Sequence, residues 1–181
     1  MRCRYCFYAD EMDKRDTRLY GMMSEDTAES IIRCALDNAD RNCVFAFQGG
    51  EPTLAGLRFF RAFTGKAREL NTKGLSMSYA IQTNGYGIDE EWAQFFAAEH
   101  FLVGVSLDGH SDLHDLYRRS ASGGGTHSTV MKSIGLLKKY GVEFNILTVV
   151  TAQTAKHCEM LYGFFRKNGL HYQQYIPCLD P

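Results

Sequence analysis

The chain has 181 residues, of which 45% are apolar and 23% are charged, as in a soluble globular protein with one sizeable core. Its formal net charge of -1 gives no electrostatic footprint for a nucleic-acid partner. No apolar run is long enough to span a bilayer, and no basic segment precedes a short apolar one. The sequence therefore predicts neither a membrane partner nor a secretory signal.

Six cysteines occur in the sequence, and only Cys3 and Cys6 are closely spaced, as C-x-x-C. Because two thiols at this spacing reach one centre from a tight loop, the pair is typical of half a zinc site, a redox dithiol or part of an iron–sulfur ligand set. The other cysteines lack the spacing of a disulfide framework, which favours a reducing, cytoplasmic location. We expect Cys34, Cys43 and Cys158 to be buried small hydrophobic residues.

The predicted elements begin after a charged and polar stretch, residues 9–23, that we expect to be a solvated loop. Ser24 is a suitable N-cap for a helix whose apolar residues recur on one face. Residues 44–47 form a nearly continuous apolar run, typical of a strand buried on both faces of a parallel sheet. The pattern then repeats, with helices expected at 57–70, after Asp89, at 128–140 and after Thr154, and strands at 77–81, 101–105, 142–150 and 170–176.

This alternation indicates the fold class. Strands that alternate with helices imply parallel pairing through right-handed crossovers. The sequence contains five strand–helix units of this kind and a closing strand, without a linker or a low-complexity tract. It therefore predicts a single α/β domain over residues 1–181.

Three polar, glycine-rich segments follow the carboxyl ends of predicted strands, at residues 48–52, 82–85 and 106–109. In parallel α/β architecture these ends converge on one face, where ligands bind. The cysteine loop precedes a helix and belongs on the same face. Each segment taken alone also suits a plain turn, and Asp108 before Gly109 is as compatible with a turn as with a site near the substrate.

Two charged side chains indicate what this face binds. Glu51 follows two glycines, which let the backbone approach a ligand closely, and its carboxylate suits an ammonium group. Arg118 suits a carboxylate. A site that holds both charges beside a metal-binding thiolate pair suits an amino-acid-like ligand.

The chain resembles the radical S-adenosylmethionine (SAM) superfamily, and within it the anaerobic sulfatase-maturating enzymes and related peptide modifiers. Four motifs carry the resemblance: Cys3-x-x-Cys6-Phe7-Tyr8, Phe47-Gln48-Gly49-Gly50-Glu51-Pro52, Gln82-Thr83-Asn84-Gly85 and Ser106-Leu107-Asp108-Gly109. It covers nearly the whole chain and implies a partial parallel (β/α)6-type barrel that lacks its first strand.

The chain departs from the superfamily pattern at its start. The pattern is C-x-x-x-C-x-x-C, in which the last two cysteines match Cys3 and Cys6 and the first would lie two residues before Met1. We therefore expect a core domain truncated at both ends, without the C-terminal extension that holds auxiliary clusters and a catalytic base. No catalytic residue is assigned within the chain.

The resemblance also implies two cofactors. Three thiolates hold a [4Fe–4S] cluster, and the amino and carboxylate groups of SAM chelate the remaining iron. Cys3 and Cys6 match cluster ligands. The positions that match SAM contacts are Tyr5 and Leu179 near the adenine, Gln48, Gly49, Gly50 and Glu51 beside the methionyl ammonium, and Ser106 and Arg118 toward the ribose and the carboxylate. His114 and His127 are lone histidines, which we expect to have surface or structural roles.

The function that the resemblance implies is the oxidation of a cysteine or serine in a peptide or sulfatase to Cα-formylglycine, with a flavodoxin- or ferredoxin-type electron donor. Related branches modify other ribosomal peptides. Two alternatives stay open from the residues alone. One is a non-catalytic protein that binds SAM or whose Cys3/Cys6 pair holds zinc or nothing. The other is a thioredoxin-like redox protein, which leaves the motif-bearing loops unexplained.

Overall fold

The computed structural model describes residues 1–6, 8, 12, 14–17 and 20–178. Its strands are β1 (Arg2–Cys3), β2 (Asn42–Phe47), β3 (Ser76–Thr83), β4 (Phe101–Ser106), β5 (Arg118–Arg119), β6 (Glu143–Val150) and β7 (Gln173–Pro177). Its helices are α2 (Glu25–Asn38), α3 (Leu57–Leu70), α4 (Glu90–Ala98), α5 (Ser111–Tyr117), α6 (His127–Lys139), α7 (Ala152–Ala155) and α8 (Cys158–Lys167), with a short 3-10 helix, η1 (Pro52–Ala55). No helix among the described residues has the length and apolar character needed to cross a membrane.

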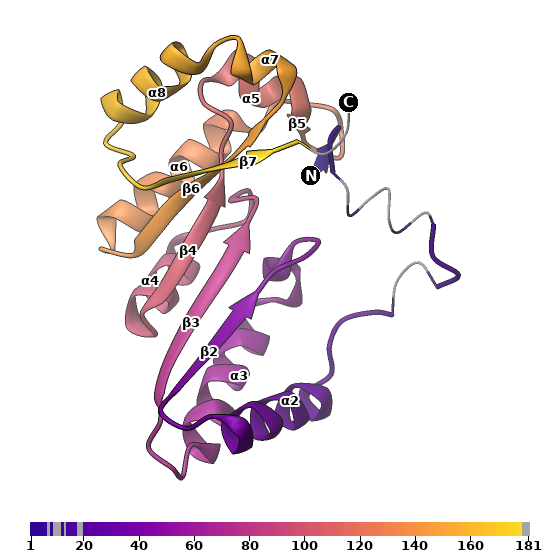
Figure 1. Cartoon of the computed structure of the whole chain (residues 1–181), viewed down its shortest axis with the longest axis vertical. Coiled ribbons are helices and arrows are strands. Elements are labelled where there is room, and N and C mark those ends of the chain that lie inside the picture. The colour runs from indigo at the N-terminus through magenta and orange to yellow at the C-terminus, as the bar shows by residue number, and fades with distance from the viewer. Residues whose placement is uncertain (7, 9–11, 13, 18–19, 179–181) are drawn as a thin grey trace.

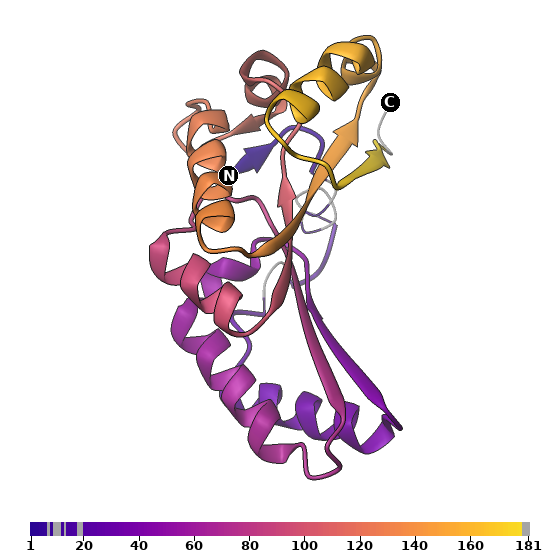
Figure 2. The same ribbon diagram turned by 90° about the vertical axis from the view of Figure 1, so that its left-hand side faces the viewer.

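Five strands form one parallel sheet in the order β2-β3-β4-β6-β7. The sheet curls, and α3, α4 and α6 lie along one side of it (Figure 1 and Figure 2). Because the strands are parallel, their carboxyl ends share one edge, and the N-terminal segment lies toward that edge (Figure 1). This arrangement confirms the predicted α/β fold with a partial barrel.

The core between the sheet and its helices is rich in aromatic side chains. Phe60 of α3, Phe96 of α4 and Phe101 of β4 are each at most 1% exposed. The Phe60 ring packs edge-on against Trp92 of α4 with their centroids 5.3 Å apart. Full burial of one such side chain contributes about 1.5–3 kcal/mol, so these contacts attach both helices firmly to the sheet.

Side chains bind backbone groups at both ends of helix α2. The Ser24 hydroxyl accepts the backbone N–H of Thr27 at 3.1 Å, which confirms the predicted N-cap. At the other end, Lys73 Nζ donates to the carbonyls of Leu36 and Asp37 at 3.0 and 2.7 Å. A cation at the carboxyl end of a helix also interacts favourably with the helix dipole.

The prediction that residues 44–47 are buried on both faces is wrong. Burial alternates along β2, where Phe45 is 7% exposed and Val44 is 65% exposed. Strand β2 is an edge of the sheet, and among the described residues only one of its faces is covered by helices. The other face belongs to the open side of the curled sheet.

Two of the three cysteines expected in the core are exposed. Cys43 is buried as predicted, whereas Cys34 and Cys158 are exposed. Cys34 lies two positions after the fully buried Ile32, and two helical positions turn a side chain to the opposite face of α2.

The last helical region is divided in two. The helix predicted to begin after Thr154 begins instead after Thr151, whose hydroxyl accepts the backbone N–H of Thr154 at 3.2 Å. Helix α7 is followed by the separate helix α8.

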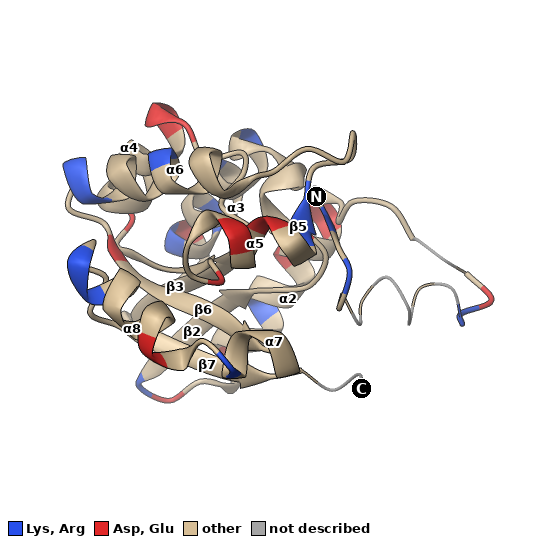
Figure 3. Ribbon diagram, turned by 90° about the horizontal axis from the view of Figure 1, so that it is seen from above, with Lys and Arg blue, Asp and Glu red and all other residues tan. Residues whose placement is uncertain are grey.

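The connection between β4 and α6 contains structure that the sequence did not predict. It forms α5 and then β5, which pairs antiparallel with β1 so that Cys3 lies opposite Arg118. Asp115 Oδ1 accepts the backbone N–H groups of Thr126 and His127 at 2.7 and 2.9 Å and closes the segment onto α6. Figure 3 shows acidic positions on α5 beside basic positions on β5 and the N-terminal strand. The start of the chain is thus attached to this connection.

The exposed edge at β2 predicts aggregation through strand pairing. Val44→Lys places a charge on the exposed face of this edge strand, and we expect slower growth of light scattering on concentration with an unchanged melting temperature. Leu54→Lys is the matched control, because Leu54 is 70% exposed but lies on η1. Equal suppression by both variants would show that general surface charge, and not the strand edge, controls aggregation.

Candidate functional site

The two motif cysteines lie on one tight loop at the carboxyl edge of the sheet. Strand β1 pairs with β5, the backbone N–H of Arg4 donates to the Tyr117 carbonyl at 3.0 Å, and that of Cys6 donates to the Cys3 carbonyl at 3.2 Å. Both thiols are free and partly exposed. This turn is compatible with two thiolates that bind one centre. Among the described residues no group of three or more His, Cys, Asp and Glu side chains gathers as a metal site.

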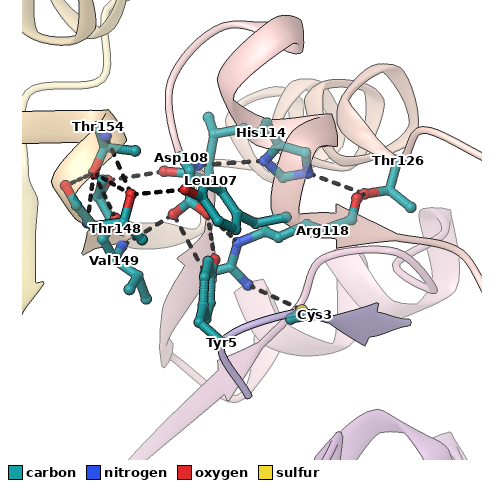
Figure 4. Close-up of polar contacts among 12 residues, drawn as sticks. Cys3, Tyr5, Leu107, Asp108, His114, Arg118, Thr126, Thr148, Val149 and Thr154 are labelled. Carbon is teal, nitrogen blue, oxygen red and sulfur yellow. Dashed lines mark hydrogen bonds and ion pairs between the residues drawn. The ribbon is translucent and has the colours of Figure 1, made fainter. Parts of the chain in front are cut away.

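A buried ion pair lies directly behind this loop (Figure 4). Arg118 Nε donates to Asp108 Oδ2 at 2.8 Å, and the two side chains are 7% and 0% exposed. The same Asp108 oxygen accepts the hydroxyl of Tyr5, whose ring lies 5.3 Å from the Arg118 guanidinium carbon. Arg118 Nη1 is 3.9 Å from the Sγ of Cys3. The pair therefore contacts two residues of the cysteine loop.

These surroundings shift several pKa values. Burial raises the pKa of the Cys3 thiol, although the positive charge of Arg118 opposes this shift. Burial and the neighbouring Asp108 carboxylate also raise the pKa of Tyr5, so its hydroxyl keeps its proton and donates it. Burial disfavours the charged form of Arg118, but the negative charge of Asp108 outweighs it and raises the Arg118 pKa.

Asp108 is also fixed to the sheet. The backbone N–H of Val149, in β6, donates to Asp108 Oδ1 at 3.0 Å. The neighbouring Thr148 hydroxyl donates to the Leu107 carbonyl at 2.8 Å. Asp108 is therefore more than a turn residue, because its carboxylate connects β6, β5 and the cysteine loop.

Glu51 joins the first two motif segments. Its Oε1 accepts the hydroxyls of Thr53 and Thr83 at 2.7 and 2.8 Å, and its Oε2 accepts the backbone N–H of Asn84 at 2.7 Å. The segments after β2 and β3 are therefore held together by one carboxylate. Both of its oxygens already have donors within the protein.

The two glycines before Glu51 have backbone conformations that favour glycine. Gly49 and Gly50 have φ values of 93° and 55°. They turn the chain sharply at the end of β2. The preceding Gln48 donates from Nε2 to the hydroxyl of Tyr8 at 3.1 Å, a second contact between the motif segments and the N-terminal segment.

The structure thus brings most of the predicted site residues to one edge. Ser106 is the last residue of β4 and is partly buried there. Leu179 lies outside the described residues. The sequence did not predict the pairing of Asp108 with Arg118, nor the links of His114 to Asp108 and Thr126. One local signal pointed to these contacts: His114 and Arg118 are four residues apart, at the end of α5.

Loss of one partner of the buried pair should destabilise the fold. Asp108→Asn keeps the shape but leaves the Arg118 charge buried without compensation, and we expect the free energy of unfolding to fall by about 3 kcal/mol in urea titrations. Glu29→Gln is the control, since it removes a partner of the exposed Arg33–Glu29 pair, joined at 2.6 Å. That variant should leave the urea midpoint unchanged. Similar urea midpoints for both variants would show that loss of a partner costs no more in the buried ion pair than in the exposed one.

The buried His114 should make the free energy of unfolding depend on pH. Burial, helped by the Arg118 charge, lowers its pKa from 6.5 to about 4. The unfolded chain then binds a proton at His114 more readily than the folded chain does. The contribution of the neutral ring to the free energy of unfolding is therefore complete above pH 6.5 and is lost as the pH falls toward about 4. The loss amounts to about 3 kcal/mol, measured as the difference between wild type and His114→Asn in urea titrations across this range. Parallel curves for the two proteins would refute it.

Comparison with known proteins places the site in a family. The Radical SAM superfamily profile matches residues 1–165. The chain is 46% identical over 181 residues to a cysteine-type anaerobic sulfatase-maturating enzyme of Clostridium novyi, with 100% of this chain and 48% of the relative covered. It is 34% identical to a serine-type anaerobic sulfatase-maturating enzyme of Bacteroides thetaiotaomicron, with 99% and 44% covered.

A solved structure agrees with these relatives. The native anSMEcpe structure with bound AdoMet and Cp18Cys peptide has a TM-score of 0.93 and 44% identity, and the match covers 100% of this chain and 48% of that one. The chain spans about half the length of these relatives. The family takes its name from SAM, and a [4Fe–4S] cluster is characteristic of it. Because the family match extends over residues 1–165 and the motif loops meet at one edge of a partial barrel, the chain belongs to the radical SAM superfamily.

Proposed function

We propose that residues 1–181 form the core of a radical SAM oxidoreductase that matures sulfatases, converting a cysteine of an unfolded peptide segment to Cα-formylglycine. The observation that carries the proposal is the 46% identity with a cysteine-type maturase along the whole chain. Identity with the serine-type relative is lower, at 34%, which favours cysteine over serine as the target.

Cys3 and Cys6 would provide two of the thiolates that hold the cluster. The tight turn from Cys3 to Cys6 fits two ligands of one centre, and the positive charge of Arg118 near the Cys3 sulfur partly offsets the burial that raises the pKa of this thiol. Hydrogen bonds to cluster sulfurs are one means by which a protein adjusts a reduction potential.

The SAM pocket would lie beside this loop. Its residues are Tyr5, Gln48, Gly49, Gly50, Glu51, Ser106, Arg118 and Leu179. Support comes from their position, since those that the structure describes lie in the cysteine loop, in the segments at the carboxyl ends of β2 and β4, or in β5. Gly49 and Gly50 leave backbone accessible beside the site, and Glu51 holds the segments around it in register.

Cys3 and Cys6 would hold the cluster, which would supply the electron for reductive cleavage of SAM, and SAM bound beside them would supply the group that abstracts hydrogen from the substrate. The protein residues act by placement. Asp108 fixes Arg118, which presents its guanidinium between the cysteine loop and the sheet edge. The Tyr5 hydroxyl keeps its proton, donates a hydrogen bond to Asp108 and so holds the loop against the sheet.

The partners follow from this chemistry. A flavodoxin- or ferredoxin-type protein would supply the electron, and a sulfatase segment would be the substrate. The six free cysteines suit a reducing, cytoplasmic location.

Anaerobic reconstitution tests the proposal. The chain is produced with Cys-Asn joined before Met1, which completes the three-cysteine pattern, and is loaded with iron and sulfide. We expect a cluster absorption that dithionite bleaches and formation of 5′-deoxyadenosine from SAM.

Two serine variants separate the site from other thiols. Cys3→Ser should abolish the cluster absorption, whereas Cys34→Ser, at an exposed position on α2, should leave it intact. SAM binding without cleavage, or zinc in place of iron, would identify a non-catalytic protein.

A further inference from the structure

His114 has no part in the proposed chemistry, yet it is 0% exposed at the centre of the polar contacts in Figure 4. Its Nδ1 accepts the backbone N–H of Asp108 at 3.3 Å, and its Nε2 lies 3.0 Å from the hydroxyl of Thr126. Thr126 is also 0% exposed. Both ring nitrogens of a buried histidine are thus engaged.

These partners fix the position of the ring proton. A backbone N–H can only donate, so Nδ1 accepts and the proton of the neutral ring lies on Nε2. The Thr126 hydroxyl donates to the carbonyl of Arg118 at 2.8 Å and is free to accept that proton. The ring and the hydroxyl together link the backbone of Asp108 to the backbone of Arg118. The lowered pKa of His114 agrees with a neutral ring.

Asp108 and Arg118, whose backbones are linked in this way, also contact the cysteine loop through their side chains. Asp108 accepts the hydroxyl of Tyr5, and Arg118 Nη1 lies 3.9 Å from the Cys3 sulfur. The directions of both side chains depend on where their backbones are held. Among the described residues, the link through His114 and Thr126 joins those backbones within the buried interior.

We propose that His114 is a positioning residue whose Nε2–H tautomer sets the Asp108–Arg118 pair, so that the pair holds Tyr5 and the proposed cluster ligand Cys3 in place before any cofactor binds. A side chain behind the ligands thereby pre-organises them. The inference concerns contacts within the chain alone, so it can fail while the proposed function stands, and the reverse.

The reaction rate of Cys3 with iodoacetamide in the metal-free full chain tests this proposal. Mass spectrometry of the alkylated peptides gives the rate at each cysteine. Cys34 is exposed and reports the reactivity of the reagent, whereas Cys43 is 7% exposed and reports global unfolding. A change at Cys3 with no change at Cys43 is therefore a local effect.

Two conservative variants separate positioning from simple filling of space. His114→Asn keeps an acceptor where Nδ1 lies, and His114→Gln keeps a donor where Nε2 lies and is closer to histidine in volume. In His114→Gln the backbone N–H of Asp108 loses its acceptor, and the cost of an unpaired buried N–H corresponds to about tenfold faster reaction of Cys3. His114→Asn keeps that acceptor, so we expect Cys3 to react at most about threefold faster. A space-filling role predicts the opposite order.

The tautomer is measured separately by two-bond ¹H–¹⁵N spectra of the wild-type imidazoles near neutral pH, with the His114 signals identified by their loss in His114→Asn. A proton on Nε2 alone is the expected result. A proton on Nδ1, or Cys3 reactivity that is unchanged or highest in the Asn variant, would overturn the proposal. If both variants unfold, accelerated Cys43 alkylation reveals it, and the wild-type tautomer decides.

Discussion

A buried ion pair between Asp108 and Arg118 connects the start of the chain to the carboxyl edge of the sheet. Asp108 accepts hydrogen bonds from Arg118 of β5, from the backbone of β6 and from Tyr5 of the cysteine loop. Burying two charges costs solvation that their attraction only partly returns, so such a pair is a poor source of net stability. Its value here is geometric, because an ion pair with these hydrogen bonds permits few arrangements of the loop that it holds.

The sequence predicted the parallel sheet and its helices well, because both depend on local periodicity. The cap at Ser24 directly precedes the apolar stripe of α2, and the glycine-rich turn at Gly49 directly follows β2, so each of these signals is local in the sequence. Where this reasoning failed, the missing information was non-local. Val44 is exposed because it faces the open side of the curled sheet, as does Leu102 of the central strand β4, and no pattern within residues 44–47 says which face of the sheet is covered.

The candidate site was predicted by its loops and not by its contacts. The motif segments were correctly expected at one edge, since parallel strands bring their carboxyl ends together. The pairing of Asp108 with Arg118, the bridge through His114 and the strand pair β1–β5 were not predicted. Polar contacts between such segments have no period, and the partners of the cysteine loop are 103 and 115 residues away from it.

Those separations have a consequence for how the protein is made. The first strand, β1, pairs with β5, and the link that fixes Arg118 ends at Thr126. During synthesis the chain emerges from its amino end, so the two thiols leave the ribosome long before their support exists. They stay unanchored until more than two thirds of the 181 residues have been translated. Loading of the proposed cluster therefore belongs after the central part of the sheet has folded, and premature oxidation of these thiols is a hazard of the earlier interval.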